Sequence, residues 1–256
     1  MKDFRTLLFV LFAAAMSAYA GDVTARDIQE QRGTGDLGIV IERATGTVLI
    51  IDTTQRRTIS RLEGLGDLSH ASAVLSSDAR FAYVFGRDGG LTKIDVLTCS
   101  ITRRIIQAGN SIGGAISDDG RLVAVANYEP GGIKVFDSTT LTEVANIPAI
   151  WSGGQSKVIG LEDAPGRRFV FSLWDAGETW ITDFSNSGAP LITKFTGIGS
   201  QPYDALITGD GRYYVAGLFG EDGLTVLDLW KAPLEPRRIL RGYGRGETQL
   251  PVYKMP

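Results

Sequence analysis

The chain has 256 residues, and 26 Lys and Arg against 29 Asp and Glu leave a formal net charge of −3. Basic residues are scattered rather than clustered, which argues against a nucleic-acid surface and against binding to an anionic membrane. A single Cys and a single His exclude an internal disulfide and a zinc site built from Cys and His. No Pro-rich linker or low-complexity tract divides the chain, so we expect one globular domain.

The first 20 residues are typical of a secretory signal peptide. A basic start precedes an apolar run over residues 7–15, and residues 18–20 match an A-x-A cleavage site. The apolar run is too short to span a bilayer. We therefore expect a signal peptide at 1–20, a mature protein without a membrane span, and export to the periplasm.

A strand that ends in Asp recurs along the rest of the chain. The closing residues are Asp52, Asp95, Asp137, Asp183 and Asp228. Their spacings are 43, 42, 46 and 45 residues, a period typical of the four-stranded blades of a β-propeller. The sequence therefore predicts an all-β fold, with a propeller domain of about five blades over residues 21–256.

One repeat illustrates the predicted blade. We expect an inner strand at 71–76, a second strand at 81–85, a third at 91–95 and an outermost strand at 101–107. The turn between the first two strands contains Asp-Gly in two later repeats, and Asp-Gly supplies the left-handed backbone that a tight hairpin turn requires. Some strands, such as 169–171, are apolar throughout, which indicates burial on both faces between stacked blades.

The blade plan places two sets of loops on opposite faces of the propeller. Loops that lead into an inner strand share a face with loops that join the second and third strands. Unusual polar residues and glycines are concentrated in this set, and such loops around a central funnel are typical of a ligand site. The candidate residues there are His70, Arg87, Asn110, Ser111, Tyr128, Glu129, Lys157, Trp174, Asp175, Tyr203, Asp204, Glu221 and Asp222.

Three of these residues have a specific interpretation beside an ordinary one. His70 directly precedes an inner strand and is either an ordinary loop histidine or an axial ligand of a haem iron. Arg87 is either a solvated charge, paired locally with Asp88, or a guanidinium fork for a ligand carboxylate. Asp204 is either a turn cap or, where it faces the funnel, a general base.

Longer segments around these residues carry a family resemblance. They are residues 67–72, 84–95, 107–117, 127–132, 201–207 and 243–247. The first two, with His70 and the sequence Gly-Arg-Asp at 86–88, resemble the haem d1 propeller of cytochrome cd1 nitrite reductase. Together the segments resemble the NirF family of haem d1 biosynthesis proteins, over nearly the whole chain after the signal peptide.

The resemblance implies a ligand and a reaction. The ligand is haem d1 or dihydro-haem d1, with His70 on the iron, Arg87 at the acidic side chains, and Asn110, Tyr128 and Tyr203 around the macrocycle. The reaction is dehydrogenation of a propionate side chain to an acrylate, for which Asp204 and His70 are the expected catalytic residues. The electron acceptor is not indicated, and nitrite reductase or other haem d1 maturation proteins are the expected partners.

The family propeller has eight blades, whereas about five fit in this chain, so the sequence resembles an N-terminal portion of such a protein. Two other functions stay open. One is a non-catalytic periplasmic protein that binds and delivers haem d1, and the other is a surface propeller that mediates protein contacts and binds no tetrapyrrole. Product formation from dihydro-haem d1 separates the enzyme from the carrier, and the absorption spectrum of a bound tetrapyrrole separates both from the third.

Overall fold

The structure is a computed structural model that describes residues 33–186 and 188–241. The predicted signal peptide at 1–20 and the similar segment at 243–247 lie outside these ranges. Within them the one helical element is a short 3-10 turn at Thr34–Asp36, and no helix is long and apolar enough to cross a membrane.

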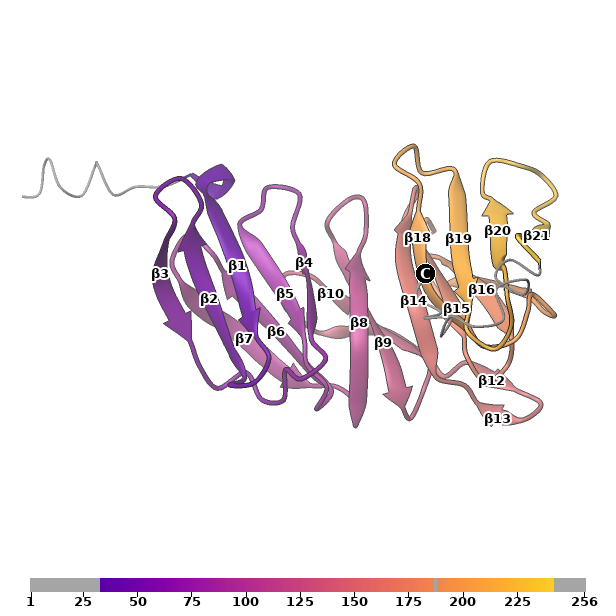
Figure 1. Ribbon diagram of the computed structural model, residues 1–256, viewed down its shortest axis with the longest axis horizontal. Helices are drawn as coiled ribbons and strands as arrows, with labels where there is room; N and C mark the ends of the chain where they lie inside the picture. The colour runs from indigo at the N-terminus through magenta and orange to yellow at the C-terminus, as the bar shows by residue number, and fades with distance from the viewer. Residues whose placement is uncertain (1–32, 187, 242–256) are drawn as a thin grey trace, which may run out of the picture.

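The strands form antiparallel sheets that follow one another in chain order from one end of the molecule to the other (Figure 1). The described part of the first blade is the three-stranded sheet β1-β2-β3, and the next four blades have four strands each, with a two-stranded hairpin between the third and fourth. The strand bounds are β1 Leu37–Glu42, β2 Thr47–Asp52, β3 Arg57–Leu62, β4 Ser72–Leu75, β5 Phe81–Phe85, β6 Gly90–Asp95, β7 Ser100–Ile106, β8 Asn110–Ile116, β9 Leu122–Glu129, β10 Ile133–Asp137, β11 Glu143–Ile147, β12 Ile150–Trp151, β13 Gly154–Gln155, β14 Val158–Ala164, β15 Arg168–Leu173, β16 Glu178–Asp183, β17 Leu191–Phe195, β18 Pro202–Ile207, β19 Tyr213–Leu218, β20 Leu224–Asp228 and β21 Pro236–Ile239.

These sheets confirm the predicted all-β propeller. In the second blade, the observed strands β4 to β7 agree with the predicted strands to within one residue at each end. The inner strands β4, β8, β14 and β18 contact one another in succession, so they surround a common axis. The residues that begin these strands therefore converge on one end of that axis.

The Asp residues that mark the repeat stabilise the turn after each third strand. The Asp95 carboxylate accepts backbone hydrogen bonds from the turn that follows and pairs with the Arg80 guanidinium at 2.9 Å. Asp228 pairs in the same way with Arg212 at 2.8 Å. The repeat is visible in the sequence because each blade uses the same local hydrogen bonds.

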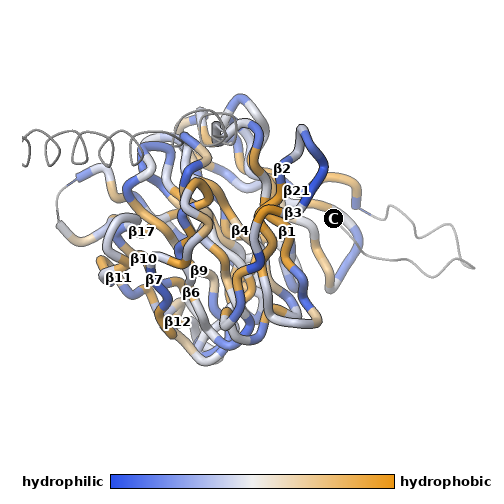
Figure 2. Tube along the Cα trace, turned by 90° about the vertical axis from the view of Figure 1, so that its left-hand side faces the viewer, coloured by the Kyte–Doolittle hydropathy of each residue, from blue (hydrophilic) through white to orange (hydrophobic). Residues whose placement is uncertain are grey.

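Apolar side chains fill the spaces between neighbouring blades. Along the chain trace, hydrophobic residues are concentrated in the strands and hydrophilic residues in the loops (Figure 2). One buried cluster lies at each interface: Val48 packs between the first and second blades, Phe85 between the second and third, Phe171 between the third and fourth, and Tyr214 between the fourth and fifth. The middle strands are apolar on both faces because each face packs against a neighbouring blade.

The loops at the starts of the inner strands are tied to the blade beside them. The hydroxyl of buried Ser111 donates a hydrogen bond to the Gly86 carbonyl at 2.7 Å. The backbone N–H of Arg87 donates to the Asp67 carbonyl at 2.8 Å. These bonds hold the Arg87 loop beside the segment that leads to His70.

The tight turn of the second blade contains a residue in a strained conformation. Ala79 has φ 55°, whereas the equivalent position in the third blade is Gly120 with φ 71°. Because the left-handed conformation costs an L-residue about 1–2 kcal/mol, partly offset by the greater unfolded-state entropy of Gly, we expect Ala79→Gly to raise the unfolding free energy by about 0.5–1 kcal/mol. Urea denaturation would measure the change.

The reverse substitution is the matched control. A Cβ added at Gly120 would meet no atom within 4 Å, so Gly120→Ala tests the backbone conformation without a steric clash. We expect it to lower the unfolding free energy by a similar amount. Equal stabilities for the parent protein and both variants would contradict the turn geometry.

Candidate functional site

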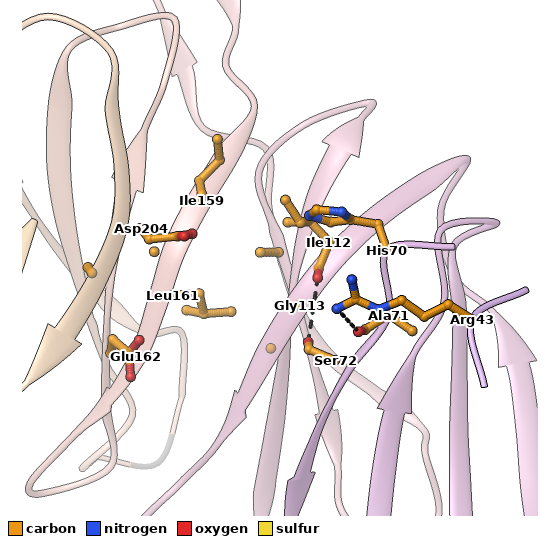
Figure 3. Close-up of a pocket in the computed structure, with 14 residues that line it drawn as sticks. Arg43, His70, Ala71, Ser72, Ile112, Gly113, Ile159, Leu161, Glu162 and Asp204 are labelled. Atoms are coloured by element: carbon orange, nitrogen blue, oxygen red, sulfur yellow. Dashed lines mark hydrogen bonds between the residues drawn. The ribbon is translucent and has the colours of Figure 1, made fainter. Parts of the chain in front are cut away.

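A cavity of about 270 Å³ opens between the four inner strands (Figure 3). Its walls come from the start of β4 and the segment before it, from β8, β9, β14 and β18, and from the turn between β1 and β2. The lining residues are Arg43, His70, Ala71, Ser72, Ile112, Gly113, Gly114, Ala126, Ile159, Gly160, Leu161, Glu162, Asp204 and Ala205. Five blades thus contribute to one central site.

Ionisable side chains stand on opposite sides of this cavity. Arg43 and His70 come from the first two blades, and Glu162 and Asp204 come from the last two (Figure 3). The Arg43 guanidinium donates a hydrogen bond to the Ala71 carbonyl at 3.3 Å, which fixes it next to the start of β4. The site therefore has a basic wall, which is Arg43 and His70, and an acidic wall, which is Glu162 and Asp204.

Two glycines, one on β8 and one on β14, allow these inner strands to pack closely against neighbouring strands. A Cβ at Gly114 would lie 2.2 Å from the Ala124 carbonyl oxygen and 2.5 Å from the Phe85 ring. A Cβ at Gly160, where φ is +59°, would lie 2.5 Å from the Tyr203 carbonyl oxygen. Both contacts are shorter than any side chain tolerates, so these positions require glycine and the cavity wall there is bare backbone.

His70 influences the carboxyl group of Asp204 across the cavity. Asp204 is open to the water in the funnel, yet the surrounding protein desolvates it in part, which raises the pKa of its carboxyl group. The nearby His70 acts in the opposite direction and lowers that pKa. Asp204 lies inside strand β18 rather than in the turn before it, which argues against the turn-cap interpretation.

Tyr128, Tyr203 and Arg87 form the rim next to Asp204. Burial raises the pKa of the Tyr128 hydroxyl, and a side-chain hydrogen bond with Tyr203 and the charge of Asp204 raise it further, whereas Arg87 lowers it. The Asp88 carboxylate pairs with Arg104 at 2.5 Å, so the local Arg87–Asp88 pair does not form. The exposed Arg87 side chain faces this rim without lining the cavity itself.

Asn110, Lys157, Asp175 and Glu221 lie outside the cavity lining, as do the rim residues. Asn110 begins β8, and its buried Oδ1 atom has no hydrogen-bond partner within the described ranges. Lys157 forms an ion pair with Asp175 at 3.0 Å, and Glu221 accepts a hydrogen bond from the Ser200 backbone at 2.7 Å. The contacts of Lys157, Asp175 and Glu221 are those of residues that hold loops in place.

An aromatic cluster of Trp174, Tyr203 and Phe219 extends the same face away from the cavity. The ring centroids are 5.4 Å apart for Trp174 and Tyr203, 5.1 Å for Trp174 and Phe219, and 5.6 Å for Tyr203 and Phe219. Such edge-to-face and tilted contacts stabilise the loops that carry them. They keep Tyr203 next to Tyr128 and Asp204.

Arg43 and Glu162 line the cavity but are not among the site residues predicted from the sequence. Arg43 lies in the loop between the second and third strands of its blade, so the loop rule used for Arg87 could have found it. Glu162 lies within an inner strand, where a register shift between Ile159 and Glu162 interrupts the alternation of side chains. No local signal in the sequence marks that shift apart from Gly160.

The propeller and its central site define the class of protein. Residues 32–256 match the family described as Cytochrome D1 heme domain, so the chain belongs to this family. In the described part of the chain, no group of three or more His, Cys, Asp and Glu residues is arranged to hold a metal ion. His70 therefore stands as a single imidazole on the cavity wall.

Among curated proteins, the chain is similar to Protein NirF from two organisms. It is 61% identical over 251 residues to that of Stutzerimonas stutzeri, which covers 97% of this chain and 63% of the relative. The identity to Protein NirF of Pseudomonas aeruginosa is 65% over 228 residues, or 88% of this chain and 58% of the relative. The chain thus spans about three fifths of the length of these relatives.

A more distant relative has a name that describes a reaction. The dihydro-heme d1 dehydrogenase of Pseudomonas aeruginosa is 32% identical over 196 residues, covering 76% of this chain and 39% of the relative. The solved structure of dihydro-heme d1 dehydrogenase NirN in complex with DHE matches with a TM-score of 0.71 and 27% identity, over 81% of this chain and 44% of that one. The β-propeller domain of Cps50 (Swd1) from Myceliophteria thermophila matches at a TM-score of 0.63 and 15% identity, over 80% and 66% of the chains, which shows the fold alone.

The acidic wall generates a prediction about stability and pH. Burial, the Asp204 charge and the Asp163 charge raise the pKa of Glu162 to about 7, and burial and Asp118 raise that of Asp163 to about 7. A raised pKa means that between pH 4.5 and 7 the folded state binds more protons than the unfolded state, so the unfolding free energy falls as pH rises. We expect the Glu162→Gln variant to lose less unfolding free energy over this pH range. The double variant with Glu162→Gln and Asp163→Asn should lose still less.

Denaturant unfolding from pH 4.5 to 8 would measure this slope. Glu63→Gln, at an exposed position away from the cavity, is the control and should leave the slope unchanged. A parental slope in the Glu162→Gln variant would show that Glu162 is not desolvated in the folded protein.

Proposed function

We propose that the protein binds a haem d1-type tetrapyrrole in the central funnel and acts in haem d1 biosynthesis. In its specific form, the proposal is that dihydro-haem d1 is dehydrogenated to haem d1. The observation that carries it is the position of His70, the single histidine of the chain, on the wall of the cavity between the inner strands of a Cytochrome D1 heme domain protein. The similarity to a dihydro-heme d1 dehydrogenase, both in sequence and in structure, supports the reaction.

The residues present fit one part of a flat, carboxylate-bearing macrocycle. Gly113 and Gly114 leave a wall of backbone on which a planar ring would lie, with the His70 imidazole beside it. A cavity of about 270 Å³ is small for a whole tetrapyrrole, since small-molecule sites usually have about 300–1,000 Å³. We propose that the residues of the NirF relatives outside the matched region form the remaining wall of the funnel.

Residues of the cavity and its rim have proposed contacts with the side chains of the ligand. Arg43 would bind a ligand carboxylate by charge-assisted hydrogen bonds, and Arg87 would bind another at the rim. Asn110, Tyr128 and Tyr203 are proposed to complete the rim around the macrocycle. The His70 imidazole would bind the iron of the macrocycle as an axial ligand.

Asp204 is the proposed general base. Conversion of a propionate to an acrylate breaks one C–H bond on each of two adjacent carbons, forms a C=C bond, and releases two protons and two electrons. Asp204, with a pKa raised by partial desolvation, is a stronger base than a solvated aspartate and would accept one of these protons. His70 would hold the ring so that the reacting side chain faces β18, and the electrons pass to an acceptor outside this chain.

The setting of the reaction is part of the proposal. The signal peptide expected from residues 1–20 would place the protein in the periplasm, where nitrite reductase or other haem d1 maturation proteins would receive the product. The alternative function is a non-catalytic carrier that binds haem d1 for delivery. Both functions require the tetrapyrrole site, and only the first requires Asp204 as a base.

The first test concerns His70. If its imidazole is an axial ligand, His70→Ala will shift the absorption bands of bound haem d1 and weaken its binding. Ser69→Ala, at the neighbouring exposed position outside the cavity, is the control and should keep the parental spectrum. Titration of haem d1 followed by absorption would measure both properties, and a parental spectrum and affinity for His70→Ala would remove His70 from the site.

The second test separates catalysis from carriage. Asp204→Asn keeps the size of the side chain and removes its basicity, so we expect haem d1 binding to survive and turnover of dihydro-haem d1 to fall by about 10²–10⁴-fold. Asp210→Asn is the control, because Asp210 accepts a backbone hydrogen bond in the turn after β18 and does not line the cavity. Parental turnover in Asp204→Asn would rule out Asp204 as the base, and absence of turnover in the parent protein with an added electron acceptor would favour the carrier.

A further inference from the structure

Glu162 has no role in the function proposed above, although it lines the same cavity as His70 and Asp204. It lies on β14 and points into the funnel on the same side as Asp204, with Arg43 and His70 on the opposite side (Figure 3). Its carboxyl group is mostly buried. A buried acid on a ligand-binding wall needs a physical explanation, because an unpaired buried charge is costly.

The backbone holds Glu162 in this inward position. The register of β14 shifts between Ile159 and Glu162, where Gly160 has a left-handed φ. The hydroxyl of buried Tyr214 donates a hydrogen bond to the Gly160 carbonyl at 2.8 Å and shares another with the Ser172 hydroxyl at 2.8 Å. The interface between the fourth and fifth blades thus fixes the segment that presents Glu162 to the cavity.

The groups around Glu162 disfavour its ionised form. The groups that interact with it electrostatically are Asp204 from β18, the adjacent Asp163 on its own strand and Tyr214 from β19, and none of these is a cation. The cationic side chain of Arg43 and the imidazole of His70 stand across the cavity. Burial and the two neighbouring aspartates raise the pKa of Glu162 to about 7, so a small further change in its surroundings is enough to protonate it near neutral pH.

Binding of a carboxylate-bearing ligand would change the surroundings of Glu162 in this way. It would displace water from the funnel and bring a further negative charge to a space that already holds two carboxyl groups. Like charges in a partly desolvated site do not all stay ionised, and one group takes up a proton. Glu162 is the more deeply buried of the two acids, whereas Asp204 is more open to water and lies under the influence of His70.

We propose that Glu162 binds the ligand in its neutral form and donates a hydrogen bond to a carboxylate of the macrocycle, so that each binding event takes up one proton from the solvent. This inference rests on the proposed function, because it takes the carboxylate-bearing tetrapyrrole as the ligand. It adds a residue for ligand recognition that acts only when protonated. It also leaves Asp204 ionised beside a neutral neighbour, which is the state a general base requires.

Isothermal titration calorimetry measures this proton directly. Haem d1 would be titrated into the protein at pH 8 in buffers of different ionisation enthalpy, and the dependence of the binding heat on that enthalpy gives the number of protons taken up. We expect close to one proton for the parent protein and close to none for Glu162→Gln, with binding retained. Between pH 7.5 and 8.5 the parental affinity should fall about tenfold per pH unit, as one linked proton requires, and the variant should lose this dependence.

Two controls isolate the cause. Glu63→Gln, at an exposed position away from the cavity, should take up the parental number of protons. The methyl ester of haem d1, which lacks free carboxylates, should bind to the parent protein without proton uptake, and this comparison needs no variant. Circular dichroism would verify the fold of each variant.

The outcomes are distinct. Proton uptake that persists in Glu162→Gln would overturn the inference, and uptake abolished only by Asp204→Asn would transfer the proton to Asp204. Equal uptake with haem d1 and its methyl ester would show that the ligand carboxylate is not the trigger. If the parent protein binds no haem d1 at all, the proposed function fails first and the inference fails with it.

Discussion

The close approach of the inner strands around one axis is the constraint on which the rest of the structure depends. At Gly114 and Gly160 the neighbouring backbone and the Phe85 ring leave no room for a Cβ atom. Because the inner strands of the described blades lie around this axis, the cavity at the centre is lined by glycine backbone and by small and apolar side chains. The ionisable side chains that reach this cavity are His70, Asp204, Glu162 and Arg43.

The order of blades along the chain sets the polarity of the site. The first two described blades supply Arg43 and His70, and the fourth and fifth supply Glu162 and Asp204. A propeller places blades that are distant in sequence on opposite sides of the axis, so a difference in charge between early and late blades becomes a difference between two walls. Such a cavity would orient an anionic ligand, because electrostatic complementarity acts on orientation as well as on affinity.

The core between the fourth and fifth blades connects packing to the site. Tyr214 belongs to the buried cluster of that interface and also holds the Gly160 carbonyl through its hydroxyl group. A buried hydrogen bond contributes only about 0.5–1.5 kcal/mol of stability, but a misplaced one leaves a polar group unsatisfied. The position of Glu162 is therefore determined by the same contacts that join the two blades.

The sequence by itself determined the blades, because the features that define them are local. Asp at the end of each third strand, a tight turn before each second strand and strands that are apolar on both faces all act within one repeat, and the strands of the second blade confirm them. The predicted loop face followed from this pattern, and it contained His70 and Asp204, which do line the cavity. It also contained Arg87 and Tyr128, which lie at the rim, and Asn110, which does not line the cavity.

Only the tertiary structure decided which charges meet. Arg43 is 28 residues from Ala71 along the chain, yet its guanidinium binds the carbonyl of that residue and reaches the cavity. Glu162 faces inward because the register of β14 shifts beside Gly160, and a shift of one residue exchanges the two faces of a strand. Alternation in the sequence cannot locate such a shift, which lies where Gly160 packs against the Tyr203 backbone and accepts a hydrogen bond from Tyr214 in the next blade.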